Sequence, residues 1–155
     1  MQIKNIGKEK ALQKIKHYCT YQERCHKEVK EKLYSFGLYK NETEIVLSQM
    51  IEENYLNEER YAIAFAGGKF RLNHWGKIKI GYELKQKGVS EYCINKALDA
   101  IGENEYSETL NKLYKEKLRT LKEKNVFSAR KKLYAYLSQK GYESNLISGI
   151  IKGLT

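Results

Sequence analysis

One short pattern occurs three times along the chain and constrains its fold more than any single motif does. In each copy a glycine follows two apolar residues that stand eight and four positions before it. The copies are Val29, Leu33 and Gly37; Ile80, Leu84 and Gly88; and Leu133, Leu137 and Gly141. Residues four apart share one face of a helix, and glycine readily adopts the left-handed conformation that ends one. The glycines are 51 and 53 residues apart, a near-constant period that predicts tandem modules.

The composition favours helices throughout. The 155 residues include no proline, and Glu, Lys, Leu and Ala fill the intervals between the glycines, as is typical of helical segments. Modules of about fifty residues have marginal cores when isolated, so the copies must pack on one another or on a partner. We predict an all-α fold, an elongated array of three tandem three-helix repeats over residues 1–56, 57–103 and 104–155. The alternative is a single bundle of nine amphipathic helices, which would need no matched glycine spacing.

Capping residues and glycines predict the limits of the helices. Thr20 with Glu23, and Asn41 with Glu44, resemble capping boxes, while Asn57 and Ser90 are good N-caps. The expected helices cover residues 8–18, 20–36, 41–53, 57–72, 76–87, 90–101, 105–123 and 128–140, and a last helix that begins at Glu143 or Ser144.

Several classes of function find no support in the sequence. No apolar run approaches the ~18 residues that a membrane span needs, and lysines interrupt the N-terminus, so we expect a cytoplasmic protein. The three cysteines form an odd set with spacing unlike a zinc site, and we expect reduced thiols and no metal. We find no phosphate-binding loop, nucleophile motif or paired-carboxylate motif, which argues against an enzyme or a cofactor.

Basic residues are clustered rather than evenly spread. Residues 104–155 hold eleven basic and five acidic side chains, a net charge of +6, whereas residues 1–56 and 57–103 each have a net charge of +2. Two segments, 60–82 and 124–142, contain no acidic residue, and they overlap when each is measured from its own glycine. Such registered basic segments favour a positive strip that binds a polyanion, although unpaired surface lysines with no partner are the alternative.

The candidate binding residues are the cations of these two segments. They are Lys69, Arg71, Lys77, Lys79, Lys124, Arg130, Lys131, Lys132 and Lys140. Trp75 lies among the lysines of the first segment and could stack on a base, but a lone tryptophan is more often a packing anchor, and we favour that interpretation.

The segment from Asn54 to Ala62, which reads N-Y-L-N-E-E-R-Y-A, resembles the "G-Y-L-D-D-x-R-F-A" signature of the RecX family. Further residues match the downstream family pattern "F…R…G-x-x-R-I…L…K-G-I": Phe65, Lys69, Gly76, Lys79, Ile80, Leu84, Lys87, Gly88 and Val89. Asn54 replaces the usual glycine, Asn57 and Glu58 replace the acidic pair, and Lys69 replaces an arginine. The first and third copies resemble the flanking repeats of the same family.

The resemblance implies an array of three-helix repeats that modulates, usually by inhibition, the RecA recombinase in DNA repair, homologous recombination and the SOS response. It implies a monomer that binds the RecA–single-stranded-DNA filament, with double-stranded DNA as a second candidate ligand. Several weak module contacts along a filament would combine into one tight interaction. Two alternatives remain open: a nonspecific DNA-binding helical protein without a recombinase partner, and a solenoid that binds only protein.

Overall fold

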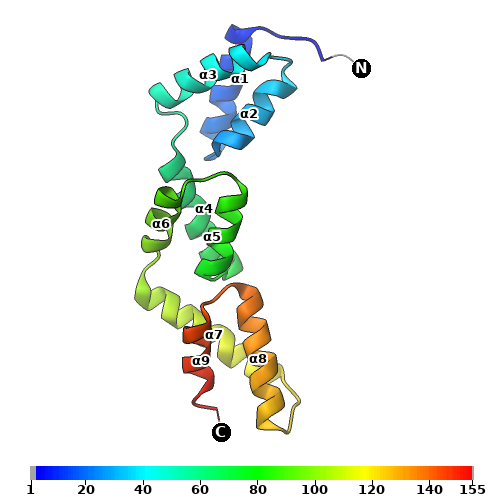
Figure 1. Ribbon diagram of the computed structural model, residues 1–155, viewed down its shortest axis with the longest axis vertical. Helices are drawn as coiled ribbons and strands as arrows, with labels where there is room; N and C mark the ends of the chain where they lie inside the picture. The colour runs from blue at the N-terminus through cyan, green and yellow to red at the C-terminus, as the bar shows by residue number, and fades with distance from the viewer. Residues whose placement is uncertain (1–2, 155) are drawn as a thin grey trace.

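The computed structural model describes residues 3–154, which form an elongated stack of three three-helix units (Figure 1). Unit 1 contains α1 (Lys8–Tyr21), α2 (His26–Ser35) and α3 (Lys40–Glu52). Unit 2 contains α4 (Glu58–Asn73), α5 (Lys77–Gln86) and α6 (Glu91–Asp99), and unit 3 contains α7 (Glu103–Thr120), α8 (Val126–Lys140) and α9 (Ser144–Ile151). The predicted all-α array is confirmed, while the exact unit boundaries at residues 57 and 104 stay a prediction.

The repeated pattern forms the middle helix of each unit. Its six apolar residues are completely buried, and its three glycines have backbone φ angles of 85°, 79° and 101°. This left-handed conformation is the one that glycine adopts without steric cost. The pattern therefore defines both the buried face and the end of α2, α5 and α8.

Two predicted helix starts are wrong. Thr20 lies inside α1, where its hydroxyl donates to the Lys16 carbonyl at 2.7 Å, and α2 begins only after Cys25, whose N–H donates to the Glu28 carboxylate at 3.1 Å. Asn41 lies inside α3, because Glu42 accepts the N–H of Tyr39 at 3.0 Å and makes Tyr39 the N-cap. In both cases a glutamate at the third helical position fixes the start.

The other predicted caps are confirmed. Asn57 accepts the N–H of Arg60 at 2.8 Å, and Ser90 accepts that of Cys93 at 3.3 Å. Glu143, not Ser144, is the N-cap of α9. Helix α8 begins two residues before the expected Ser128, because Asn125 accepts the N–H of Phe127 at 2.8 Å.

The buried residues form two hydrophobic cores rather than three. Unit 1 has its own core, built around Ile15, Leu33 and Met50. Units 2 and 3 share a second core, to which unit 1 contributes only Cys25. The cysteines of the chain are buried free thiols, and no described helix has the length and apolar character that a membrane span requires.

Units 2 and 3 meet end to end through their middle helices. The N–H groups of Gly76 and Ile78, at the start of α5, donate to the carbonyls of Lys140 and Gly141, at the end of α8, at 2.8 and 2.9 Å. The N–H of Lys77 donates to the Tyr106 hydroxyl at 2.9 Å. The first N–H groups of a helix have no partner within it, so α8 and α7 satisfy those of α5.

Units 1 and 2 meet differently. The start of α2 faces the end of α5 across a crevice that Cys25, His26, Lys87 and Gly88 help to line. Apart from the connecting segment 53–57, no backbone hydrogen bond crosses this joint between residues 3 and 154. The main polar link is an ion pair in which Arg60 Nε lies 2.5 and 2.7 Å from the two carboxylate oxygens of Glu23.

Candidate nucleic-acid interface

Trp75 lies at the joint of units 2 and 3, in the turn between α4 and α5. His74 ends α4 in the left-handed conformation, with φ 58°, and the chain then places the half-buried indole of Trp75 against the shared core. The ammonium groups of Lys69 and Lys79 lie 4.9 and 4.6 Å from the centre of the Trp75 ring. The structure thus brings together three of the predicted residues. Trp75 packs against the core, and the ammonium groups of Lys69 and Lys79 lie against its ring.

Lys140 joins this group from unit 3. Its ammonium donates to the carbonyl of Asn73, the last residue of α4, at 3.3 Å. Nearby, the hydroxyl of Tyr142 donates to the carbonyl of His74 at 2.9 Å. We call Lys69, Trp75, Lys79 and Lys140 the junction cluster, because residues from two units hold it in place.

A buried tyrosine, Tyr106, also supports the joint of units 2 and 3. The hydroxyl of Tyr106 accepts the N–H of Lys77 and donates to the carboxylate of Glu143. Burial raises the pKa of Tyr106 and of Tyr142 well above the usual tyrosine range. Both hydroxyls therefore remain protonated at neutral pH and keep their donor function.

Lys77 is the predicted cation that is least suited to a phosphate. Its ammonium lies 4.9 Å from the centre of the Tyr106 ring, and the residue shares a hollow with Glu103, Glu108 and Glu143. A polyanion on that side would meet three carboxylates. Arg71 is exposed on the surface of α4, and its guanidinium lies against Gly67 of the same helix.

Four predicted cations, Lys124, Arg130, Lys131 and Lys132, lie at the start of α8 and form what we call the α8 cluster. Lys132 pairs with Glu123, and Arg130 donates to the carbonyl of Leu154. The Lys131 ammonium lies 5.8 Å from the centre of the exposed Phe127 ring. This cluster therefore also combines cations with an aromatic side chain.

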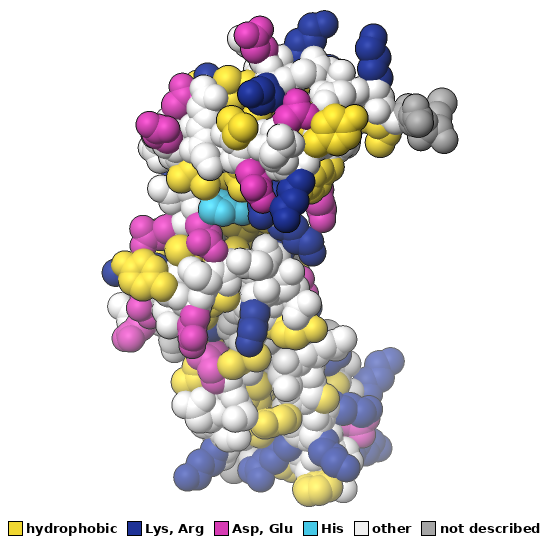
Figure 2. Space-filling view, turned by 45° about the horizontal axis from the view of Figure 1, so that its top comes forward, with side chains coloured by type: hydrophobic (Ala, Val, Ile, Leu, Met, Phe, Trp, Pro, Cys, Tyr) yellow, Lys and Arg dark blue, Asp and Glu magenta, His cyan; other side chains and the backbone are white. Residues whose placement is uncertain are grey.

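The α8 cluster lies near the start of α8, and the last residue of this helix, Lys140, belongs to the junction cluster. Ten residues separate Arg130 from Lys140, which corresponds to about 15 Å along α8 at 1.5 Å per residue. Figure 2 shows Lys and Arg side chains gathered around the lower end of the molecule, which is unit 3. The net charge of +6 in residues 104–155 is thus distributed along α8 and its surroundings.

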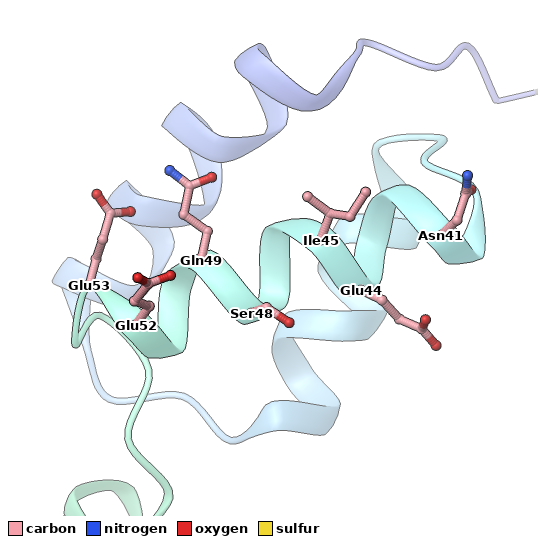
Figure 3. A pocket seen from close by; sticks show the side chains of 7 residues that line it. All are labelled: Asn41, Glu44, Ile45, Ser48, Gln49, Glu52 and Glu53. Carbon is pink, nitrogen blue, oxygen red and sulfur yellow. The ribbon is translucent and has the colours of Figure 1, made fainter.

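Unit 1 carries an opposite charge on α3. A shallow hollow runs along the exposed side of this helix, and Figure 3 shows the residues that line it: Asn41, Glu44, Ile45, Ser48, Gln49, Glu52 and Glu53. Six of them lie on α3 and Glu53 is its C-cap. Glu53 pairs with Lys16 at 3.6 Å, whereas Glu44 and Glu52 have no ion pair among the described residues and would repel a polyanion. Within residues 3–154, no three His, Cys, Asp or Glu side chains are arranged to hold a metal ion.

The search for acid-free segments missed a second group of cations in unit 1. Lys14 and Lys32 lie close to the rings of Tyr18 and Phe36 between α1 and α2. The acid-free runs that hold them, residues 10–22 and 32–41, are shorter than the two basic segments, so a count of charges along the chain does not single them out. Helical spacing signals only one of these contacts, since Lys32 precedes Phe36 by four positions, whereas Lys14 reaches the Phe36 ring from another helix.

Comparisons with known proteins also find three-helix domains in this chain. Residues 57–98 match the family described as "RecX, second three-helix domain", and residues 103–151 match "RecX, third three-helix domain". "Regulatory protein RecX" of Clostridium perfringens strain 13 is 32% identical over 99% of this chain and 74% of its own length. The protein of the same name from Thermotoga sp. strain RQ2 is 30% identical over 96% of this chain and 90% of its own.

Solved structures share the fold. The crystal structure of RecX from Lactobacillus salivarius superposes with a TM-score of 0.85 over 94% of both chains, at 21% sequence identity. A second crystal structure, of a regulatory protein RecX, gives a TM-score of 0.83 over 94% of this chain and 71% of that one. At these identities the comparison establishes the architecture alone.

Proposed function

This chain belongs to the RecX family of regulatory proteins, and on that premise we propose that it binds the RecA–single-stranded-DNA filament and inhibits its growth, ATP hydrolysis and strand exchange. In this proposal the protein acts by binding rather than by catalysis. The junction cluster and the α8 cluster contact DNA phosphates or acidic surfaces of the filament.

One observation carries this proposal: cations gather at both ends of α8. Lys140 of the junction cluster lies about 15 Å along the helix from Arg130 of the α8 cluster, and each cluster includes an aromatic residue. A polyanion with regularly spaced phosphates can engage both clusters at once, and each contact that replaces a counterion adds to the affinity. The stacked units also give the molecule an elongated shape (Figure 1), which suits a long target better than a compact one.

The test is RecA ATPase activity on single-stranded DNA, titrated with the protein at two salt concentrations. We expect inhibition that weakens at the higher salt concentration, because exposed charge pairs are screened. Inhibition that is absent at both concentrations would contradict the proposal. Equal binding to bare DNA with and without RecA would instead favour a nonspecific DNA-binding protein.

A pair of charge reversals tests the α8 cluster directly. Lys124→Glu with Lys131→Glu changes two exposed cations for which the described residues 3–154 offer no ion pair. The matched control is Lys8→Glu with Lys40→Glu, which makes the same change of charge on exposed residues of unit 1. We expect at least about tenfold weaker inhibition from the first variant alone, since several phosphate contacts act together.

A further inference from the structure

A hollow between α1 and α2 has the composition of a binding site, although neither acid-free segment includes it. Its lining includes the cations Lys14, Arg24 and Lys32 and the aromatic residues Tyr18, Tyr21 and Phe36. No carboxylate belongs to this lining. The hollow lies in unit 1, whose other exposed side, along α3, is acidic.

The cations and the rings of this hollow are interleaved. The Arg24 guanidinium carbon lies 3.8 Å from the centre of the Tyr18 ring, and Arg24 Nε donates to the Tyr18 carbonyl at 3.1 Å. The Lys32 ammonium lies 5.4 Å from the Tyr18 ring and 5.8 Å from the Phe36 ring, and that of Lys14 lies 5.6 Å from the Phe36 ring. The guanidinium is therefore held as a flat surface over one ring, while two lysines lie nearby.

These cations lack acidic partners. The ion pairs within residues 3–154 involve Lys16, Arg60 and Lys132, and none involves Lys14, Arg24 or Lys32. Two glutamates near these cations in the sequence are engaged elsewhere: Glu28 accepts the N–H of Cys25 at 3.1 Å, and Glu23 pairs with Arg60. The positive charge of the hollow is thus available to a ligand.

We propose that this hollow binds a nucleotide of single-stranded nucleic acid, with its base against the Tyr21, Phe36 and Arg24 surfaces and its phosphate on Lys14 and Lys32. Aromatic rings and guanidinium planes accept bases of any sequence, and ammonium groups neutralise the backbone. An acidic peptide would use the cations but leave the rings without a planar partner. The proposal deepens the proposed function, because it adds a DNA contact in unit 1, but its test needs no recombinase.

Photochemical cross-linking locates the contact. The full-length protein is irradiated with a single-stranded oligonucleotide that carries 5-bromodeoxyuridine, and mass spectrometry identifies the modified peptides. We expect adducts at Tyr18, Tyr21 or Phe36 in addition to any at Trp75. Adducts confined to units 2 and 3, or no adduct at all, would overturn the proposal. The proposed function is tested separately, by measuring the inhibition of RecA.

Salt dependence provides the second test. Lys14→Ala with Lys32→Ala should reduce the slope of log affinity for oligo(dT) against log salt concentration by about 1.4, or about 0.7 for each lost phosphate contact. Lys8→Ala with Lys40→Ala, which removes two exposed charges of the same unit outside the hollow, should leave the slope unchanged. Circular dichroism is used to check that both variants are folded. Equal slopes for the two variants, or equally tight binding of poly-glutamate to the native protein, would overturn the proposal.

Discussion

Gly141 and Gly88 occupy the same position in consecutive units, yet their surroundings differ. Both have positive φ angles, of 101° and 79°. A Cβ atom on Gly141 would overlap the Cβ of Lys79, whereas one on Gly88 would meet no atom within 4 Å. Gly141 thus serves both the end of its own helix and the close approach of unit 2.

Replacing each glycine with alanine separates these two roles. Gly88→Ala should lower the free energy of unfolding by about 1–2 kcal/mol, the cost of a left-handed conformation for a residue with a side chain. Gly141→Ala should cost more, because α5 must also move away from the end of α8. Urea denaturation measures both values, and equal losses for the two variants would contradict the packing of Gly141 against Lys79.

Buried titratable groups predict a loss of stability at alkaline pH. Burial raises the pKa of the Cys19 thiol to about 11 from an ordinary value of 9.0, and it also raises that of Tyr61, Tyr106 and Tyr142 above 10.0. These groups contribute stability that is fully present below their unfolded pKa and is lost as the pH rises towards their folded pKa.

Thermal melts followed by circular dichroism between pH 7 and pH 11 should therefore show a Tm that is steady up to about pH 9 and then falls. Cys19→Ala removes the thiol contribution and should delay the beginning of this fall. A Tm that stays constant to pH 11 in the native protein would show that these groups titrate normally in the folded state.

At the scale of the helices, the sequence predicted the buried faces better than the starts. The apolar residues before each glycine are all buried, because spacing alone determines a helix face. Thr20 and Asn41 were wrong as caps because a better placed carboxylate, that of Glu28 or Glu42, occupies the third position of the actual helix. The caps that the structure shows there, Cys25 and Tyr39, are not typical capping residues, so a search for good capping residues could not find them.

The end-to-end contact of α8 and α5 depends on Tyr106, which the sequence did not single out. Tyr106→Phe removes a donor to Glu143 and leaves the buried N–H of Lys77 without its acceptor. We expect a loss of about 1–3 kcal/mol in the free energy of unfolding, since an unsatisfied buried polar group is costly.

Tyr142→Phe is the matched control for this change. It removes one hydroxyl bond to the His74 carbonyl and should cost only about 0.5–1.5 kcal/mol. Chemical denaturation of the two variants in parallel provides the comparison. A greater loss for Tyr142→Phe would show that the bond to Lys77 contributes little to the joint.

At the scale of the whole molecule, the two joints between units differ in their connections. Units 2 and 3 share a core and two backbone hydrogen bonds, whereas units 1 and 2 share the buried Cys25 and the Arg60–Glu23 ion pair. Partly exposed ion pairs contribute little stability. The joint that attaches unit 1 to unit 2 is thus weaker than the joint between units 2 and 3.

Amide hydrogen exchange tests this difference. The N–H groups of Gly76 and Ile78 should exchange slowly, because both donate across the joint of units 2 and 3. Those of His26 and Lys27, at the equivalent start of α2, should exchange much faster, because opening there breaks no backbone bond between units. Similar protection at the two joints would show that all three units open together.

The sequence located part of the candidate interface. Lys69, Lys79 and Lys140 belong to segments without acidic residues, and the fold brings them together around Trp75. Lys14 and Lys32 were missed because they lie in different helices, each in an acid-free run that is shorter than the two basic segments. Only the packing of α1 against α2 places their side chains around the same rings.

The middle helices of the three units run in the same direction, each starting near the end of the one in the next unit (Figure 1). The macrodipole of a helix corresponds to about half a positive charge at its N-terminus and half a negative charge at its C-terminus. Where α8 meets α5, these partial charges neutralise each other. The positive end of the whole series is the start of α8, next to Lys124 and one turn before Arg130, Lys131 and Lys132, so the backbone itself adds to the electrostatic potential that attracts an anion to this end of the array.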